Sequence, residues 1–222
     1  MKVIVGMECS GITRNAFNAL GHDATSCDLK PTRRPGKHIQ GDIFGVLRAQ
    51  RFDLGIFHPP CTYLTVTANK WLKDQPERKS GALVGAARRE ARRLAIQFVK
   101  DLWALATEQC DAVVFENPVG CLSTEWMKPT QIIQPWQFGH VEPKKTCLWL
   151  HNLPLLRPTK IVEPEYHTTE SGKKVPTWFF FADRSKGQEH RAEIRSNTFT
   201  GVAEAFASQW SAPVTKPQLT LF

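Results

Sequence analysis

The chain has 222 residues, of which 41% are hydrophobic, and it carries a formal net charge of +8. This length and apolar content suffice for a buried core, so we expect a soluble globular protein with one large domain or a medium domain plus a small one. No apolar run approaches the roughly 20 residues needed to cross a bilayer, which argues against a membrane role.

The basic residues occur in groups along the chain. Their excess favours a polyanionic partner, with nucleic acid first, although solvated Lys and Arg faces are the alternative. The groups are Arg33 and Arg34, Arg78 and Lys79, Arg88 and Arg89, Arg92 and Arg93, Lys144 and Lys145, and Lys173 and Lys174.

The six cysteines, at positions 9, 27, 61, 110, 121 and 147, form no C-x-x-C pair. This spacing argues against a zinc site and against a disulfide scaffold. The N-terminal stretch MKVIVGMECSG has neither the long apolar run nor the cleavage site of a signal peptide. We therefore expect reduced thiols and a cytoplasmic location, in a bacterial cell or a phage-infected host.

The first third of the chain alternates between strand and helix patterns. Residues 2–6 form a short β run. Helical spacing begins after Ser10, which we predict to cap the helix, and it stops at Gly21. Residues 24–27 are the next strand candidate, and a loop rich in Pro and Arg then leads to a turn around Asp42.

The middle of the chain repeats this alternation. The apolar residues 54–57 predict a buried strand that stops at His58, because the two prolines that follow have no N–H to donate to a neighbouring strand. A long helix is predicted over residues 84–106, and DAVVFENP (111–118) predicts a second buried strand. Further strand candidates are residues 131–133 and 146–150.

Strands that alternate with helices predict an α/β fold with a mostly parallel sheet and helices on both faces. We expect a core over residues 1–150 and a short excursion over residues 151–197, which are rich in Pro and Lys. Helical spacing over residues 198–210 predicts a helix that returns to the core. Residues 211–222 form a proline-bearing tail, which we expect to be flexible.

Polar residues at strand ends suggest a nucleotide-like site. Asp28 and Asp42 end the second and third β segments, at the edge where Ser10 and Gly11 begin the first helix. A helix N-terminus offers unpaired N–H groups, and an acid after the second strand of such folds commonly binds ribose hydroxyls. We therefore predict a site for a nucleoside-bearing cofactor; the alternative is that both acids are ordinary turn residues.

Cys61 and Glu116 form a second pair of candidates. If their strands are neighbours, the thiol and the carboxyl face one crevice and can act together on a planar substrate. The alternative for Cys61 is a small buried apolar residue. Asn117 and Pro118 follow Glu116 and can hold it in a fixed direction, since proline restricts the residue before it.

These residues carry a resemblance to a known family. FDLGIFHPPCTYLT resembles the catalytic loop of DNA (cytosine-5)-methyltransferases, and VVFENP resembles their Glu-Asn-Val stretch. ECSGITRNAFNALG is similar to their S-adenosylmethionine loop and helix, CDL to their acidic ribose position and GDI to their adenine-edge position. PKKTCLWL and SNTFTGVAEAFA resemble two later motifs. The resemblance covers about residues 1–150 and 195–210 and is greatest to short, phage-type members.

The resemblance implies a Rossmann-like methyltransferase fold, S-adenosylmethionine as cofactor and DNA as partner. It implies that the Cys61 thiolate attacks C6 of cytosine while Glu116 holds N3 protonated, so that C5 takes the methyl group and loss of the C5 proton then expels the thiol. The target base must be flipped out of the duplex or single-stranded.

By the same resemblance, each site residue has an implied role. The catalytic residues are Cys61, Glu116 and Lys145. The cofactor-binding residues are Glu8, Ser10, Gly11, Asp28, Asp42, Pro59 and Asn197. The substrate-binding residues are Thr62, Tyr63, Lys70, Trp71, Asn117 and Lys144.

Three departures from the family pattern bear on the function. The cofactor loop has one glycine, Gly11, lysines stand at 144 and 145 where arginines are expected, and the excursion is much shorter than the usual recognition domain. We therefore expect low or unusual sequence selectivity. The alternatives are cysteine-dependent C5 modification of a nucleotide or with another one-carbon donor, and an inactive fold that binds DNA and the sliding clamp.

The C-terminal QLTLF resembles the peptide by which bacterial proteins dock into the sliding clamp of the replisome. An extended segment with apolar anchors and one polar Gln suits a preformed pocket. The resemblance implies that Gln218, Leu219, Leu221 and Phe222 bind this partner. The alternative is a terminal strand that packs on its own domain.

Overall fold

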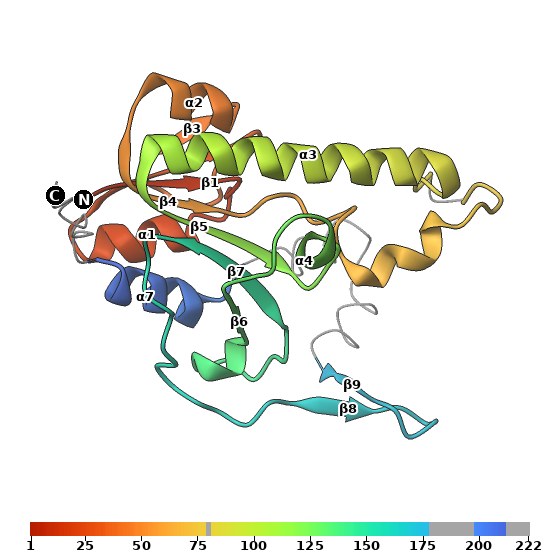
Figure 1. The fold of residues 1–222 in the computed structure, drawn as a ribbon. Coiled ribbons are helices and arrows are strands. Elements are labelled where there is room, and N and C mark those ends of the chain that lie inside the picture. Colours follow the sequence, from red (N-terminus) through yellow and green to blue (C-terminus); the bar gives the residue numbers. More distant parts are fainter. Residues whose placement is uncertain (79–80, 178–197, 212–222) are drawn as a thin grey trace, which may run out of the picture.

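The computed structural model describes residues 1–78, 81–177 and 198–211. Its centre is a seven-stranded sheet in the order β3-β2-β1-β4-β5-β7-β6 (Figure 1). The strands in that order are β3 (His38–Gln40), β2 (Asp23–Asp28), β1 (Lys2–Gly6), β4 (Phe52–Phe57), β5 (Cys110–Pro118), β7 (Thr146–His151) and β6 (Gln131–Ile133). The first five are parallel, and β7 runs antiparallel to both of its neighbours.

Helices cover both faces of the sheet. Helices α1 (Ile12–Ala19) and α7 (Thr200–Gln209) lie on one face, and α2 (Ile43–Ala49) and α3 (Gly85–Gln109) lie on the other (Figure 1). A hydrophobic core lies on each face of the sheet, because side chains along a strand point alternately to the two faces. Leu54 and Ile56 pack on the α7 side, whereas Phe57 packs on the α3 side. The prediction of a mostly parallel α/β sheet flanked by helices is confirmed, and the architecture is compatible with a Rossmann-like fold.

The structure differs from the sequence prediction at two helix starts. At the N-terminus of α1, Gly11 is the capping residue with φ of 71°, while the Ser10 hydroxyl, one residue earlier, still accepts a hydrogen bond from Ile12 N. Asp42 does not end a plain turn but caps α2, accepting from Phe44 N at 3.1 Å. This helix was missed because seven residues are too few for a helical period to stand out.

The segment after β7 joins the last helix to the core. Leu156 is buried on the α7 side, and Trp210 Nε1 donates to the Pro154 carbonyl at 3.1 Å. The Gln209 side chain makes two hydrogen bonds of 2.8 Å with the Arg157 backbone. Short elements complete the described chain: η1 (Val66–Leu72), α4 (Leu122–Glu125), η2 (Pro135–Gln137) and a separate two-stranded ribbon of β8 (Tyr166–Thr168) and β9 (Lys174–Pro176). No helix in the described ranges is long and apolar enough to span a membrane.

Candidate active site

The predicted site residues gather at one edge of the sheet. Glu8 follows β1, Asp28 ends β2, Cys61 follows β4, and Glu116 lies near the end of β5. These strands are parallel and adjacent, so their carboxyl ends meet at the same edge. The order of the strands reverses between β1 and β4, which is where open α/β sheets keep their ligand crevices.

The loops that contain Pro-Pro-Cys and Glu-Asn-Pro are bonded directly to each other. The side-chain amide of Asn117 donates to the Pro59 carbonyl at 2.7 Å, and Cys121 N donates to the Leu64 carbonyl at 2.8 Å. At Gly120, a Cβ atom would lie 2.1 Å from the Leu64 carbonyl oxygen, so only glycine permits this approach. The structure therefore brings together two motifs that are far apart in the sequence.

Glu116 lies close enough to Cys61 to influence the ionisation of its thiol. Burial raises the pKa of the Cys61 thiol above its ordinary value, the negative charge of Glu116 raises it further, and the positive charge of Lys144 opposes both. The Cys61 residue is partly exposed rather than sealed in the core. The two predicted groups thus share one region of the edge.

Glu116 has an ionic partner that sequence analysis missed. His58 Nδ1 lies 3.3 Å from Glu116 Oε2, and the two side chains are 12% and 19% exposed. Burial alone would raise the pKa of Glu116, but the hydrogen bond and charge of His58, with Lys144 and a hydrogen bond from Thr146, hold it below its ordinary value. The sequence held one signal for this contact: residues 54, 56 and 58 alternate along the strand, which places His58 on the same face as Leu54 and Ile56.

The two lysines before β7 differ in their surroundings. Lys145, predicted to be catalytic, is exposed, whereas Lys144 is partly buried and its charge acts on both Cys61 and Glu116. Lys144 Nζ also lies 5.5 Å from the centre of the Phe199 ring, at the start of α7. The structure therefore favours Lys144 as the cation of this site.

Two arginines of α3 hold the loop that follows Cys61. Arg88 donates to the Thr62 carbonyl at 3.1 Å, and Arg92 donates to the Tyr63 carbonyl at 2.8 Å and to Asn69 Oδ1 at 2.7 Å. Both arginines are buried, with 6% and 8% of their surfaces exposed. Their side chains are therefore committed to this loop, whereas the neighbouring Arg89 and Arg93 are exposed.

The predicted substrate-binding residues fall into two groups. Thr62 and Lys70 are exposed, Tyr63 lies under the Arg88 guanidinium, and the Trp71 ring has Arg78 at 3.7 Å and Lys70 at 4.7 Å from its centre. Asn117 differs because it is 1% exposed and bonded to Pro59. Asn117 therefore joins the two motif loops.

The predicted cofactor turn is built around a buried acid. Glu8 is 4% exposed, and its Oε1 accepts from the Ser10 hydroxyl and from Thr13 N, each at 2.8 Å. Its Oε2 is buried and has no hydrogen-bond partner among the residues that the structure describes. Glu8 thus organises the first turn of α1 and leaves one carboxylate oxygen unsatisfied, which is uncommon in folded proteins.

The two predicted acids of the cofactor site both have local backbone partners. Asp28 Oδ1 accepts from Lys30 N at 2.9 Å, and Asp42 caps α2. Both lie close to Cys27, where burial, with their charges added, raises the pKa of the thiol to about 11. Both acids therefore bond to nearby backbone, as ordinary turn residues do. They also lie at the sheet edge where a nucleoside-bearing cofactor is predicted to bind.

Arg14 is a further residue that sequence analysis missed. Its side chain is fully buried, and it donates to the carbonyls of Arg34 at 2.9 Å and Pro35 at 2.8 Å and to the Ser26 hydroxyl at 2.9 Å. Arg34 in turn donates to the Ser10 carbonyl at 3.0 Å. Arg14 thereby fixes the loop 30–38 against the turn after β1. Its position on an apolar helix was no signal in the sequence.

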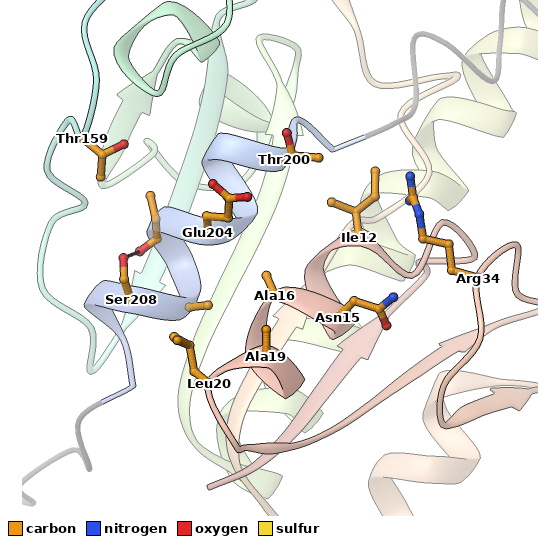
Figure 2. A pocket seen from close by; sticks show the side chains of 12 residues that line it. Ile12, Asn15, Ala16, Ala19, Leu20, Arg34, Thr159, Thr200, Glu204 and Ser208 are labelled. Atoms are coloured by element: carbon orange, nitrogen blue, oxygen red, sulfur yellow. Dashed lines mark hydrogen bonds between the residues drawn. The ribbon is translucent and has the colours of Figure 1, made fainter.

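A groove of about 550 Å³ lies between α1 and α7 (Figure 2). It is lined by small apolar and polar side chains: Ile12, Asn15, Ala16, Ala19, Leu20, Arg34, Thr159, Thr200, Glu204, Ala205, Ala207 and Ser208. None of the predicted site residues that the structure describes belongs to this lining. The groove is therefore distinct from the edge that holds Cys61 and Glu116.

Asn197, predicted to bind the cofactor, and the tail residues Gln218, Leu219, Leu221 and Phe222 lie outside the described residues. Comparison of the chain with protein-family models and with curated proteins gives no match. The functional interpretation therefore depends on the chain's own residues.

Proposed function

We propose that this protein is a DNA cytosine C5-methyltransferase that uses S-adenosylmethionine. The observation that carries the proposal is the direct bonding of the Cys61 loop to the Glu116 loop at the carboxyl edge of neighbouring parallel strands. A nucleophilic thiol and a carboxyl group in one region match the two groups that pyrimidine activation requires. The sequence motifs around both residues supply the family-level reason for choosing cytosine.

The chain's own residues have complementary roles in this reaction. Cys61 would add as thiolate to C6 of the base, and Glu116 would supply the proton that N3 takes up. Lys144 favours the thiolate because it lowers the pKa that burial and Glu116 raise. Arg88 and Arg92 would keep the loop after Cys61 in place while the target base enters.

The turn after β1 fits a cofactor that carries a positively charged amine. The buried Oε2 of Glu8, which has no partner within residues 1–78, 81–177 and 198–211, is an acceptor that such a group could satisfy. Asp28 and Asp42, at the ends of the neighbouring segments, offer acceptors for hydroxyl or amino groups of a nucleoside. When bound, S-adenosylmethionine would supply an electrophilic methyl group.

The proposal is tested by incubating the purified protein with tritiated S-adenosylmethionine and either DNA or dCMP. Wild-type protein and Cys61→Ala are compared, and an oligonucleotide with 5-fluorocytosine tests for covalent trapping. Trapping that requires Cys61 supports the proposal. Transfer to dCMP alone would instead select a nucleotide-modifying enzyme, and DNA binding without transfer would select an inactive methyltransferase fold.

We also propose that the QLTLF tail docks into the bacterial sliding clamp, on the strength of its sequence alone. Such a tether would deliver the enzyme to replicated DNA and would offset low sequence selectivity. Calorimetry with purified clamp should show binding by the full chain and no binding after deletion of residues 218–222. Equal binding by both proteins would contradict the proposal.

A further inference from the structure

His58 and Glu116 are placed side by side by the register of two strands. Phe57 of β4 pairs with Phe115 of β5, so the next residue on each strand faces the same way. The result is a contact of 3.3 Å between His58 Nδ1 and Glu116 Oε2. The two residues are 58 positions apart in the chain, so the contact depends on the sheet and not on local structure.

The conformation and hydrogen bonding of His58 are restricted by its surroundings. Its backbone N–H donates to the Gly6 carbonyl at 3.1 Å, and Pro59 restricts its backbone from the other side. The second ring nitrogen, Nε2, is buried, and no group in the described part of the chain forms a hydrogen bond with it. Because a carboxylate only accepts hydrogen bonds, Nδ1 must carry the proton that joins the two groups.

Several other groups face Glu116. Cys61 comes from the loop after β4, Lys144 and Thr146 come from the start of β7, and Cys147 lies within reach of its charge. Burial alone would raise the pKa of Glu116, but His58, Lys144 and Thr146 together lower it. At neutral pH the carboxyl group is therefore ionised, and it has no proton of its own to give to N3.

We infer that His58 is the positioning residue of Glu116 and holds the proton that Glu116 passes to the base. The inference rests on the proposed function. As the Cys61 sulfur bonds to C6, after its own proton has left to water, the C5=C6 electron pair shifts toward C4 and the C4=N3 pair moves onto N3. The proton passes from Nδ1 of the His58 imidazolium to the Glu116 carboxylate, and from the carboxyl group to N3, which leaves His58 neutral and Glu116 again ionised. After C5 has taken the methyl group, the C5 proton leaves to water, its electron pair restores the C5=C6 bond, and the C6–S pair leaves on sulfur. The N3 proton returns through Glu116 to His58.

The first test needs no activity. Carbon-13 NMR of glutamate-labelled protein follows the titration of Glu116 in wild type, in His58→Gln and in the control His151→Gln, at a histidine that lies at the far end of β7. We expect His58→Gln to raise the pKa of Glu116, because its hydrogen bond and charge are removed, and we expect His151→Gln to leave it unchanged. An unchanged pKa in His58→Gln would overturn the inference.

The second test measures the rate of trapping on the 5-fluorocytosine oligonucleotide between pH 6 and pH 8. Without His58, Glu116 must take its proton from water, so the loss of rate should grow with pH. We expect a loss of at least about tenfold at pH 8 and a smaller one at pH 6, since positioned proton transfer contributes roughly 10²–10⁴-fold. A loss that is equal at every pH indicates a structural role only and overturns the inference.

The two tests separate this inference from the proposed function. If the Glu116 titration responds to His58→Gln but wild-type protein traps no pyrimidine, the proposed function fails and the coupling of the pair is supported. If wild type traps the oligonucleotide and the Glu116 titration does not respond, the proposed function is supported and the role of His58 is overturned.

Discussion

The two halves of the carboxyl edge are held in a similar way but over different distances along the chain. In the cofactor half, Arg14 bonds to the carbonyl of Pro35, 21 positions away, and Glu8 bonds to Thr13, five positions away. In the catalytic half, Asn117 bonds to Pro59 across 58 positions. Buried side chains fix backbone in both halves, but only the catalytic half depends on the pairing of β4 with β5.

This difference predicts distinct responses to mutation. Damage in the cofactor half should loosen one continuous stretch of chain, while damage in the catalytic half should separate two loops that are distant in sequence. Hydrogen exchange resolved by peptide can distinguish the two patterns, because it reports local opening in each segment.

The largest effect should come from Arg14→Met. The change removes every donor that Arg14 offers to the loop 30–38, and each buried acceptor left unsatisfied costs about 1–3 kcal/mol. We expect a loss of about 2–4 kcal/mol in urea unfolding, with faster exchange confined to residues 9–11 and 30–38. The exposed Arg48→Met on α2 is the control and should stay within about 0.5 kcal/mol of wild type.

Arg92→Met should have a somewhat smaller effect in the other half. The Tyr63 carbonyl and Asn69 lose their donor, so we expect destabilisation of about 1–3 kcal/mol and faster exchange in residues 62–72. The neighbouring Arg93→Met removes only an exposed pair with Glu90 and should cause no measurable change. Equal effects of the two substitutions would contradict the role of Arg92 in holding the loop that follows Cys61.

Gly120→Ala tests the contact between the two motif loops. Its Cβ would meet the Leu64 carbonyl oxygen, so the loops must move apart, and overpacking of this kind costs about 1–3 kcal/mol. Hydrogen exchange should become faster in both the loop after Cys61 and the loop after Glu116. Gly45→Ala is the matched control: position 45 is in α2, where an added Cβ meets no side chain of the described residues within 4 Å, and the change should stabilise by up to about 1 kcal/mol.

The smallest effect is electrostatic and concerns the reactivity of Cys61. Only the thiolate reacts with iodoacetamide, so a raised pKa slows alkylation at a given pH. Glu116→Gln removes a negative charge, should lower the pKa of Cys61 and should speed its alkylation; Lys144→Gln should do the reverse. Mass spectrometry across pH 7–10 measures the rate at Cys61, with the exposed Lys100→Gln as control. Shifts in the same direction for both variants would refute the arrangement.

The sequence alone determined much of the fold. The bounds predicted for β1 and β6 agree with the structure, and the sites at strand ends followed from prolines that cannot continue a ladder. Such signals are local, because hydrophobic periodicity and the missing N–H of proline each depend on only a few neighbouring residues. The helix α2 escaped because its seven residues are too few for a clear period.

What the sequence could not determine was which polar groups meet. The contacts of His58 with Glu116, of Arg92 with Tyr63, and of Arg14 with the loop 30–38 follow from strand register and helix packing, and no local pattern encodes them. The choice of Lys144 over Lys145 is of the same kind, since adjacent residues near a strand differ only in the face they occupy. The sequence motifs therefore identify the reactive residue types. Only the tertiary structure determines the ionisation of Cys61 and Glu116 and the side chains that hold their loops in place.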